Sequence, residues 1–286
     1  MSLISRELLR REFPPSLLEI PEPPEKLWVS GNLPDESFIR ICFVGSRKHT
    51  TYGSEACKAL ISGLRGHPIA IVSGLALGID AIAHRAALDA KLPTIAVPGS
   101  GLGEKVLYPR SHLGLAEEIV HCGGALLSEF EPNFTGAPWS FPQRNRIMAG
   151  LSRAVVVIEA EVPSGTLITS RLATDYNKDV LTVPGSIFSP QSAGPHLLLT
   201  LGATPIRTSF DILQAVGIAS DESKTSFSLE DLSEDEKVLF DALKIPLERD
   251  ELIRISKLPN QRFNAALTLL ELRGAVHQTL GEISRM

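Results

Sequence analysis

Cysteine is scarce in this sequence, and no disulfide framework can be built from what there is. Only Cys42, Cys57 and Cys122 occur in 286 residues. Cys42 lies in the apolar run 41–44, which is typical of a buried strand rather than of an exposed crosslink. Because a chain without disulfides fits a reducing compartment, we expect a cytoplasmic protein.

Long apolar runs are also lacking. The first residues, 1–6, do not follow the pattern of a secretory signal, and a run such as 154–158 is too short to cross a bilayer. The sequence therefore predicts no membrane segment and no association with a membrane.

Positive charge is not in excess. The chain has 28 Lys and Arg against 33 Asp and Glu, a formal net charge of −5. A protein that coats nucleic acid through bulk charge needs a surplus of Lys and Arg, so that mode of binding is excluded. Any nucleic-acid site must be a local patch of cations.

Apolar residues, at 43% of the chain, are plentiful enough for a full α/β core. Short β-branched runs alternate with amphipathic stretches, at 41–44, 69–72, 94–97, 125–127, 155–158 and 180–183. Nearly continuous apolar strands separated by helices are typical of a parallel sheet covered on both faces. We expect an α/β fold of the extended Rossmann-like kind, with a doubly wound, mostly parallel sheet.

Composition divides the chain into four parts. Residues 1–37 form a proline-rich lead that should pack extended against the main domain, and 38–216 form the Rossmann-like domain. A polar linker, 217–231, precedes a small winged-helix-like domain at 232–286. In that domain we expect three short helices: one after the capping-box pair Ser233 and Glu236, one after Asp250, and one from Pro259 to Arg273 that stops at Gly274. Residues 275–277 and Gly281 would then supply the wing.

The end of the first strand of the main domain is a candidate phosphate site. Gly45, Ser46 and Arg47 follow the strand, and a helix is expected to begin near Ser54. Such a turn exposes backbone N–H groups, and the Arg47 guanidinium adds a bidentate donor. The alternative is a tight turn with a solvated arginine. The GxGxxG fingerprint of dinucleotide sites is absent, and no cofactor is expected.

The second strand leads into Ser73, Gly74 and Gly78, followed by Asp80 and His84. The glycines permit close backbone approach, Asp80 is placed to cap the next helix, and His84 lies one turn further along the same face. An Asp–His pair also suggests catalysis, but no Ser or Cys nucleophile stands beside it, and the structural interpretation is favoured.

The densest group of functional side chains is the segment 139–146. Arg144, Asn145 and Arg146 follow Trp139 and Phe141, so cations, an amide and stacking faces occur together ahead of an apolar stretch. Single-stranded nucleic acid requires this combination. Positive charge at the start of a helix opposes the helix dipole, and an anionic partner would remove that conflict.

Other strand ends add small residues and donors at the same edge of the sheet. These are 97–103 with Tyr108 beyond it, 164–169, and Gly185 with Ser186, the latter strand being preceded by Lys178. Open α/β sheets bind ligands at this edge, so their convergence favours a pocket. Glu159 and Glu161 allow an acid–base or metal interpretation, but no ligand spacing supports it.

Taken in order, these motifs resemble the DprA/Smf family of DNA-processing proteins. The motifs that carry the resemblance are Val44-Gly45-Ser46-Arg47, Ser73 to Asp80 with His84, Tyr108-Pro109, Ser128-Glu129, Phe141 to Arg146, Ser164 to Thr169 and Val183-Pro184-Gly185. The resemblance runs from about Phe13 to the carboxyl end. Departures from the family pattern are His112 and His196, where Asn is frequent, Asn177-Lys178-Asp179 where Gly-Arg-Asp is usual, and a missing amino-terminal helical domain.

The resemblance implies a non-catalytic single-stranded DNA-binding protein that forms a homodimer and helps to load RecA recombinase in natural transformation. It implies DNA contacts at Arg47, Arg144, Asn145, Arg146, Lys178 and Phe141, with Gly45, Ser46, Ser73, Gly74, Gly185 and Ser186 lining the pocket. Because the cations of the tail are scattered, duplex binding by the winged helix is doubtful, and docking of a partner or oligomerisation is at least as well supported.

Two other functions remain open on the sequence. Related Rossmann folds include nucleoside-monophosphate phosphoribohydrolases, which resemble a PGGxGTxxE pattern. Residues 97–104 match it in part, and 164–166 lacks the downstream glutamate. The other alternative is a nucleotide sensor or a purely architectural interaction protein.

Overall fold

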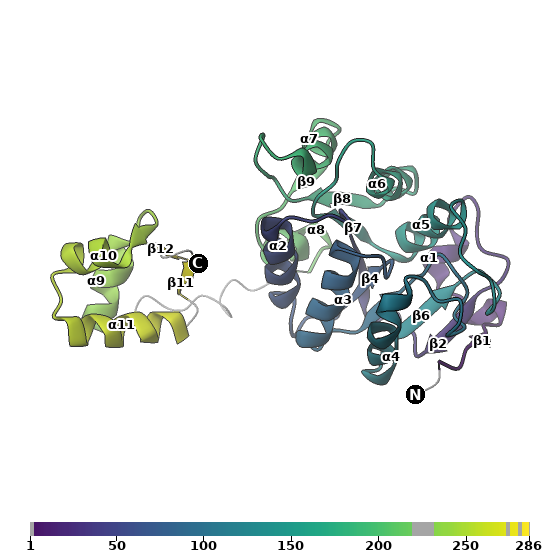
Figure 1. The fold of residues 1–286 in the computed structure, drawn as a ribbon, viewed down its shortest axis with the longest axis horizontal. Helices are drawn as coiled ribbons and strands as arrows, with labels where there is room; N and C mark the ends of the chain where they lie inside the picture. Colours follow the sequence, from purple (N-terminus) through teal and green to yellow (C-terminus); the bar gives the residue numbers. More distant parts are fainter. Residues whose placement is uncertain (1–2, 219–231, 273–274, 280–281, 286) are drawn as a thin grey trace. The chain divides into compact units, whose positions relative to one another are not determined.

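The computed structural model describes residues 3–218, 232–272, 275–279 and 282–285. The chain divides into two compact units, Met1–Ser220 and Asp221–Met286 (Figure 1). Most of the predicted linker 217–231, together with Gly274 and Gly281, lies outside the described residues, and the four predicted domain boundaries stay a prediction.

The first unit contains a nine-stranded, mostly parallel sheet in the order β1-β2-β6-β5-β4-β3-β7-β8-β9. The strands from β3 onward are parallel, whereas β1 and β2 pair antiparallel at one edge. Their bounds are β1 Arg6–Glu7, β2 Trp28–Gly31, β3 Ile39–Val44, β4 Ile69–Ser73, β5 Thr94–Ala96, β6 Ala125–Ser128, β7 Ala154–Val157, β8 Asp179–Thr182 and β9 Thr204–Pro205. The six strands predicted from apolar runs are confirmed.

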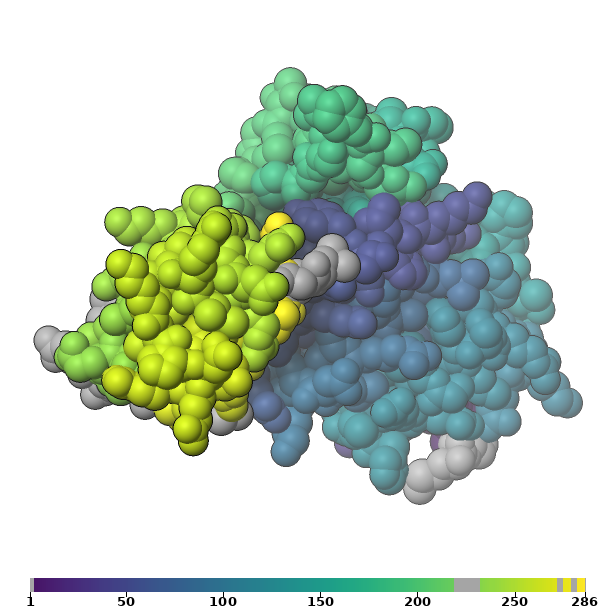
Figure 2. All heavy atoms as spheres, turned by 60° about the vertical axis from the view of Figure 1, so that its left-hand side comes forward, coloured from purple at the N-terminus to yellow at the C-terminus, as the bar shows by residue number. Residues whose placement is uncertain are grey.

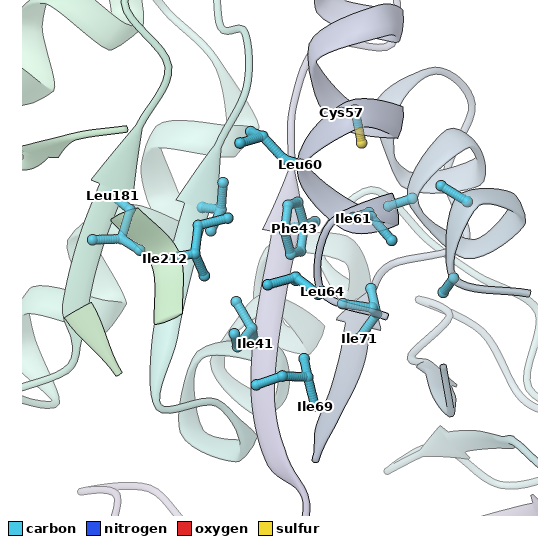
Figure 3. Close-up of a cluster of buried hydrophobic side chains, with 14 of the residues drawn as sticks. Ile41, Phe43, Cys57, Leu60, Ile61, Leu64, Ile69, Ile71, Leu181 and Ile212 are labelled. Atoms are coloured by element: carbon cyan, nitrogen blue, oxygen red, sulfur yellow. The ribbon is translucent and has the colours of Figure 1, made fainter. Parts of the chain in front are cut away.

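Alternate side chains of each strand enter cores on opposite faces of this sheet. On β3, Ile41 and Phe43 pack toward α2 (Thr51–Ser62), α3 (Ile79–Asp89) and α8 (Ser209–Ala215), as Figure 3 shows for α2. Cys42 and Val44 face the other core, with α1 (Pro15–Leu18), α5 (Ser140–Leu151), α6 (Gly165–Asp175) and α7 (Ala193–Thr200). Helix α4 (Leu113–His121) covers β5 and β6. The predicted doubly wound arrangement is confirmed.

The proline-rich lead takes part in both the sheet and the core. It supplies β1 and β2, the 3₁₀ turn Arg10–Glu12 and α1, and Leu17 and Leu27 are fully buried. Further 3₁₀ turns lie at Arg110–His112 and Pro190–Ser192. Truncating a buried leucine costs about 2–5 kcal/mol, so the lead contributes to the stability of the first unit.

The second unit has the helix and strand order of a winged helix. Helices α9 (Glu234–Ala242), α10 (Arg249–Ser256) and α11 (Asn260–Leu272) pack around a core that includes Phe263. Strands β10 (Leu247–Glu248), β11 (Val276–Thr279) and β12 (Glu282–Arg285) form a small antiparallel sheet. The predicted capping box of Ser233 and Glu236 is confirmed. Helix α10 begins at Arg249, one residue before the predicted Asp250, and Asp250 and Glu251 lie in its first turn.

Among the residues that the structure describes, none of the helices has the length and hydropathy that crossing a bilayer requires.

Candidate nucleic-acid interface

A cavity of about 680 Å³ opens at the point where the sheet reverses its strand order. It is lined by the β3–α2 turn (44–48), helix α5 with Pro138 before it, Glu161 and residues 163–166 with Thr169 at the start of α6, and Ala76 and Asp80. Successive strands lead away from β3 to one side, whereas β7 lies on its other side. Open α/β sheets bind ligands at this switch point, so the predicted edge of the sheet does form a pocket.

The β3–α2 turn brings two cations to this cavity. Arg47 and Lys48 are both exposed and both line the wall. No carboxylate within the described part of the chain pairs with either. Both are therefore available to an anion. Arg47 was predicted from the sequence, whereas Lys48 was not, although its position next to Arg47 in the same turn was the available signal.

Gly78 decides where this turn lies. Its φ is +82°, and a β-carbon there would run into the Ser46 carbonyl and the Arg47 backbone. Only glycine combines that conformation with so close an approach, so Gly78 lets the first turn of α3 pack directly against the cation-bearing turn. Helix α2 begins at Thr51, earlier than the predicted Ser54, because the Thr50 hydroxyl accepts from the Gly53 N–H.

An aromatic face lies beside Arg47. The Arg47 guanidinium carbon is 5.9 Å from the centroid of the Phe141 ring, and Phe141 packs at 5.4 Å from Tyr108 with a tilt of 58°. The Phe141 ring covers Gly99, whose lack of a side chain leaves room for it. A cation next to a ring supplies a phosphate contact and a base-stacking surface within one nucleotide's reach.

Arg144 lies at the floor of the cavity and is only 4% exposed. Its Nη1 donates to the carbonyl oxygens of Gly74, at 2.5 Å, and of Val97, and its Nε donates to Asn145 Oδ1 at 3.1 Å. Arg144 therefore ties together the ends of β4 and β5. Most of its hydrogen-bonding capacity is used inside the protein.

Asp80 completes this clamp from the other side. Its Oδ2 accepts from the N–H groups of Gly74 at 3.1 Å and Ala76 at 3.4 Å, so the predicted capping of α3 by Asp80 is wrong. Burial raises the pKa of Asp80, and the nearby Arg144 opposes that rise; burial likewise lowers the pKa of Arg144, opposed by Asp80. The clamped turn includes Leu75, whose φ of +59° is unusual for a branched residue.

The start of α6 forms the wall opposite the cations. Ser164 is its N-cap and accepts from the Thr166 N–H at 3.1 Å, while the Thr166 hydroxyl donates to the Gly45 carbonyl at 3.2 Å. A β-carbon on Gly165 would meet open space. A helix amino terminus carries partial positive charge, so this wall also favours an anion. Glu161 stands at the same wall, where Gln191 donates to it at 3.2 Å.

The structure brings some of the predicted site residues together and separates others. Gly45, Ser46, Arg47, Phe141, Arg144 and Asn145 line the cavity, and Gly74 lines a small recess beside it. The remaining five lie elsewhere: Ser73, Arg146, Lys178, Gly185 and Ser186. The DNA contacts proposed for all twelve residues stay a prediction.

Each of these five has an evident structural position. Ser73 is buried and donates to the Phe43 carbonyl. Arg146 pairs with Glu129 in a separate cavity of about 360 Å³. Lys178 precedes β8 and so lies at the opposite edge of the sheet, whereas Gly185 and Ser186 follow β8, on the same edge as the cavity but outside it.

The groups that suggested catalysis have structural partners. His84 Nδ1 lies 2.8 Å from Thr94 Oγ1, and burial lowers its pKa to about 3. Glu159 is 3% exposed and accepts from the N–H and hydroxyl of Thr50 at the start of α2. Within the described residues no group of three or more His, Cys, Asp or Glu side chains is placed to hold a metal ion.

Comparison with known proteins identifies the family. Residues 7–217 match the family model of DNA recombination-mediator protein A, and residues 223–282 match that of the DprA winged helix domain. The chain belongs to the DprA family. The DprA resemblance and the fold class predicted from the sequence are thereby confirmed.

Relatives agree with this assignment. Protein Smf of Escherichia coli is 40% identical over 202 residues, covering 71% of this chain and 54% of that protein. The DNA processing protein DprA of Streptococcus pneumoniae is 41% identical over 201 residues, covering 70% of each. The chain thus spans about half the length of the E. coli relative.

Two solved DprA structures share the fold. The S. pneumoniae protein superposes with a TM-score of 0.68 at 39% identity, covering 74% of each chain. The Helicobacter pylori DNA processing protein A, described for its single-stranded DNA binding mode, superposes with a TM-score of 0.66 at 29% identity, covering 75% of this chain and 97% of the other.

Proposed function

We propose that this DprA-family chain binds single-stranded DNA in the cavity at the switch point, protects it, and helps to load RecA recombinase onto it during natural transformation. Family membership and the DNA-binding H. pylori relative support the class of ligand. The observation that carries the proposal in this chain is the exposed Arg47 guanidinium 5.9 Å from the Phe141 ring.

The cavity's chemistry favours an unpaired strand over a duplex. Stacking on Phe141 requires the face of a base, which a duplex covers with its neighbours. Arg47, Lys48 and the amino terminus of α6 supply phosphate contacts around that ring. Arg144 has a different task, because its hydrogen bonds hold the strand ends that shape the floor.

The second unit is poorly suited to binding DNA on its own. Arg262, on helix α11, donates to Asp235 at 2.6 and 2.7 Å, and Arg249 donates to Asn264 at 2.7 Å. Cations already engaged by side chains are less available to phosphates. We therefore assign DNA binding to the first unit, and docking of a partner or oligomerisation to the second. A homodimer would place two cavities on one strand and raise affinity by avidity.

Fluorescence anisotropy with labelled oligo-dT and its duplex tests the DNA-binding part. We expect Arg47→Ala to lower single-strand affinity about tenfold, since charge-assisted hydrogen bonds contribute about 1.5–3 kcal/mol. The slope of log affinity against log salt should become shallower by about 0.7 for each phosphate that the variant no longer neutralises. Arg65→Ala is the matched control, because Arg65 is exposed and precedes β4 at the opposite edge of the sheet. An equal loss of single-strand affinity in both variants, or an affinity that does not change with salt concentration, would contradict DNA binding in the cavity.

RecA loading needs its own assay. RecA filament formation is followed on oligo-dT already covered by a single-strand-binding protein, with and without this chain. The proposal expects faster filament growth with the unaltered chain and no acceleration with Arg47→Ala. If filaments grow equally fast without the chain, the role in RecA loading is wrong while DNA binding stands.

A further inference from the structure

Two neighbouring large apolar side chains after β8 are left almost entirely in water. Ile187 is 80% exposed and Phe188 is 90% exposed. Single exposed apolar residues are ordinary on protein surfaces, but an adjacent aliphatic and aromatic pair on one loop leaves a contiguous apolar tip. In Figure 2 the green part of the chain, which includes this loop, lies at the surface of the first unit.

The base of this loop is firmly held. The Gly185 carbonyl accepts from His196 Nε2 at 3.0 Å, and a side chain at Gly185 would clash with Ser192. Ser186 closes a turn, since its Oγ accepts from the Phe188 N–H at 3.2 Å and its carbonyl accepts from the Ser189 N–H at 3.1 Å. A fixed turn presents Phe188 at low entropic cost to whatever binds it.

The loop lies at the same edge of the sheet as the cavity. It follows β8, two strands from β3 in the sheet, so the two strand ends are about 10 Å apart at a strand spacing of about 4.8 Å. Tyr52, in the first turn of α2, bridges that interval: its hydroxyl donates to the Pro184 carbonyl at 2.7 Å, and it is 52% exposed. Lys48 on the cavity wall is four residues earlier in the chain. A cation, Lys48, and an aromatic side chain, Tyr52, therefore lie at this edge of the sheet between the cavity and the loop.

We propose that Phe188, with Ile187 beside it, is a second base-stacking position for single-stranded DNA that leaves the cavity past Lys48 and Tyr52. This inference rests on the proposed function. Segment 183–192 contains no charged residue in a chain whose net charge is −5, so the tip itself offers an apolar face. The carboxylate of Glu161 contacts this segment at Gln191, where it accepts a hydrogen bond at 3.2 Å. Stacking on such a face tolerates any base sequence.

Strand length tests this position separately from the cavity. Labelled oligo-dT of about 5 nucleotides should fill the cavity alone, whereas about 15 nucleotides should also reach the loop. We expect Phe188→Ala to weaken binding of the longer strand about fivefold or more and to leave the shorter strand unchanged, with Phe188→Trp retaining affinity. Arg47→Ala should weaken both lengths. Leu9→Ala, which alters an exposed apolar side chain beside β1, is the matched control.

The outcomes separate this inference from the proposed function. If the unaltered chain binds both lengths and Phe188→Ala changes neither, or weakens both equally, the second stacking position is wrong and the cavity stands. If the unaltered chain binds neither length, both proposals fail. Sedimentation of the DNA-free protein is measured alongside. A smaller oligomer in Phe188→Ala would show that the loop contacts a second copy, which also overturns the stacking role.

Discussion

Arg144 provides the sharpest test of how the floor of the cavity is built. Replacing it with alanine removes the donor that joins the carbonyls of Gly74 and Val97, and it leaves Arg47, which acts on it more weakly, as the remaining cation near the carboxylate of Asp80, itself 6% exposed. Removing one partner of a buried charge pair typically costs about 3–5 kcal/mol, because the remaining charge stays desolvated. We expect Arg144→Ala to lower the unfolding free energy of the first unit by about that amount at neutral pH.

The loss should depend on pH in a defined direction. Burial raises the pKa of Asp80 above its ordinary 3.8, and Arg144 opposes that rise, so the pKa should climb further in Arg144→Ala. A group whose folded pKa lies above its unfolded value stabilises the fold at low pH, and this contribution is lost as pH rises through the folded pKa. Compared with the unaltered chain, the variant should therefore be least stable near neutrality and recover toward acid. Adding Asp80→Asn should remove the pH dependence.

Urea unfolding followed by tryptophan fluorescence measures this effect in the right unit, because both tryptophans, Trp28 and Trp139, belong to the first unit. The exposed Arg47→Ala should shift the unfolding free energy by less than about 0.5 kcal/mol. If Arg144→Ala costs less than about 1 kcal/mol, or if its loss is the same at about pH 5 and about pH 8, the charges of Arg144 and Asp80 do not stabilise the fold in this way. A large loss would also mean that Arg47, not Arg144, is the cleaner probe of DNA binding.

Local geometry supports three further predictions. Gly78→Ala should lower the unfolding free energy by about 1–3 kcal/mol more than Gly66→Ala and should also weaken DNA binding. Both glycines have φ +82°, but only at Gly78 would a β-carbon meet neighbouring atoms. Equal shifts of the thermal unfolding midpoint in the two variants would contradict this prediction. His84 has a folded pKa of about 3, below its ordinary 6.5, so the unfolding free energy should fall as pH drops from 6.5, by at most about 1.4 kcal/mol per pH unit. If urea titrations show the same dependence of the unfolding free energy on pH in His84→Gln, this prediction is wrong. Ser233→Ala should destabilise the second unit by about 0.5–2 kcal/mol through removal of its cap, visible in far-ultraviolet circular dichroism but not in tryptophan fluorescence; a change in fluorescence would count against it.

The sheet was predictable because the sequences of strands that are buried on both faces are short apolar runs. The runs 41–44 and 69–72 correspond to β3 and β4 with differences of at most two residues. The start of α2 was less predictable. It depends on the Thr50 side chain and on Glu159, whose carboxylate reaches the Thr50 N–H across 109 residues of sequence. Local propensity carries no information about a partner so far along the chain.

The candidate site was predictable in type but not in orientation. Arg144 and Arg146 are two positions apart on α5, about 200° around the helix, so both cannot face one cavity. The sequence did not show which face is buried. Lys178 is different, because it precedes an expected strand. In a parallel sheet that position lies at the amino edge, opposite the strand ends that form the cavity, and this signal was present in the sequence.

The sequence by itself determined the family, the doubly wound sheet and the turn that carries Arg47, because hydrophobic pattern and motif order are properties of adjacent residues. Only the tertiary structure decided that Arg47 is free at the wall while Arg144 is held within the fold. That division depends on carbonyl groups 70 and 47 positions away from Arg144, which approach it only when the strands assemble. Once the strands are assembled, burial and hydrogen bonds hold Arg144 within the fold, whereas Arg47 stays exposed at the cavity wall without a carboxylate partner.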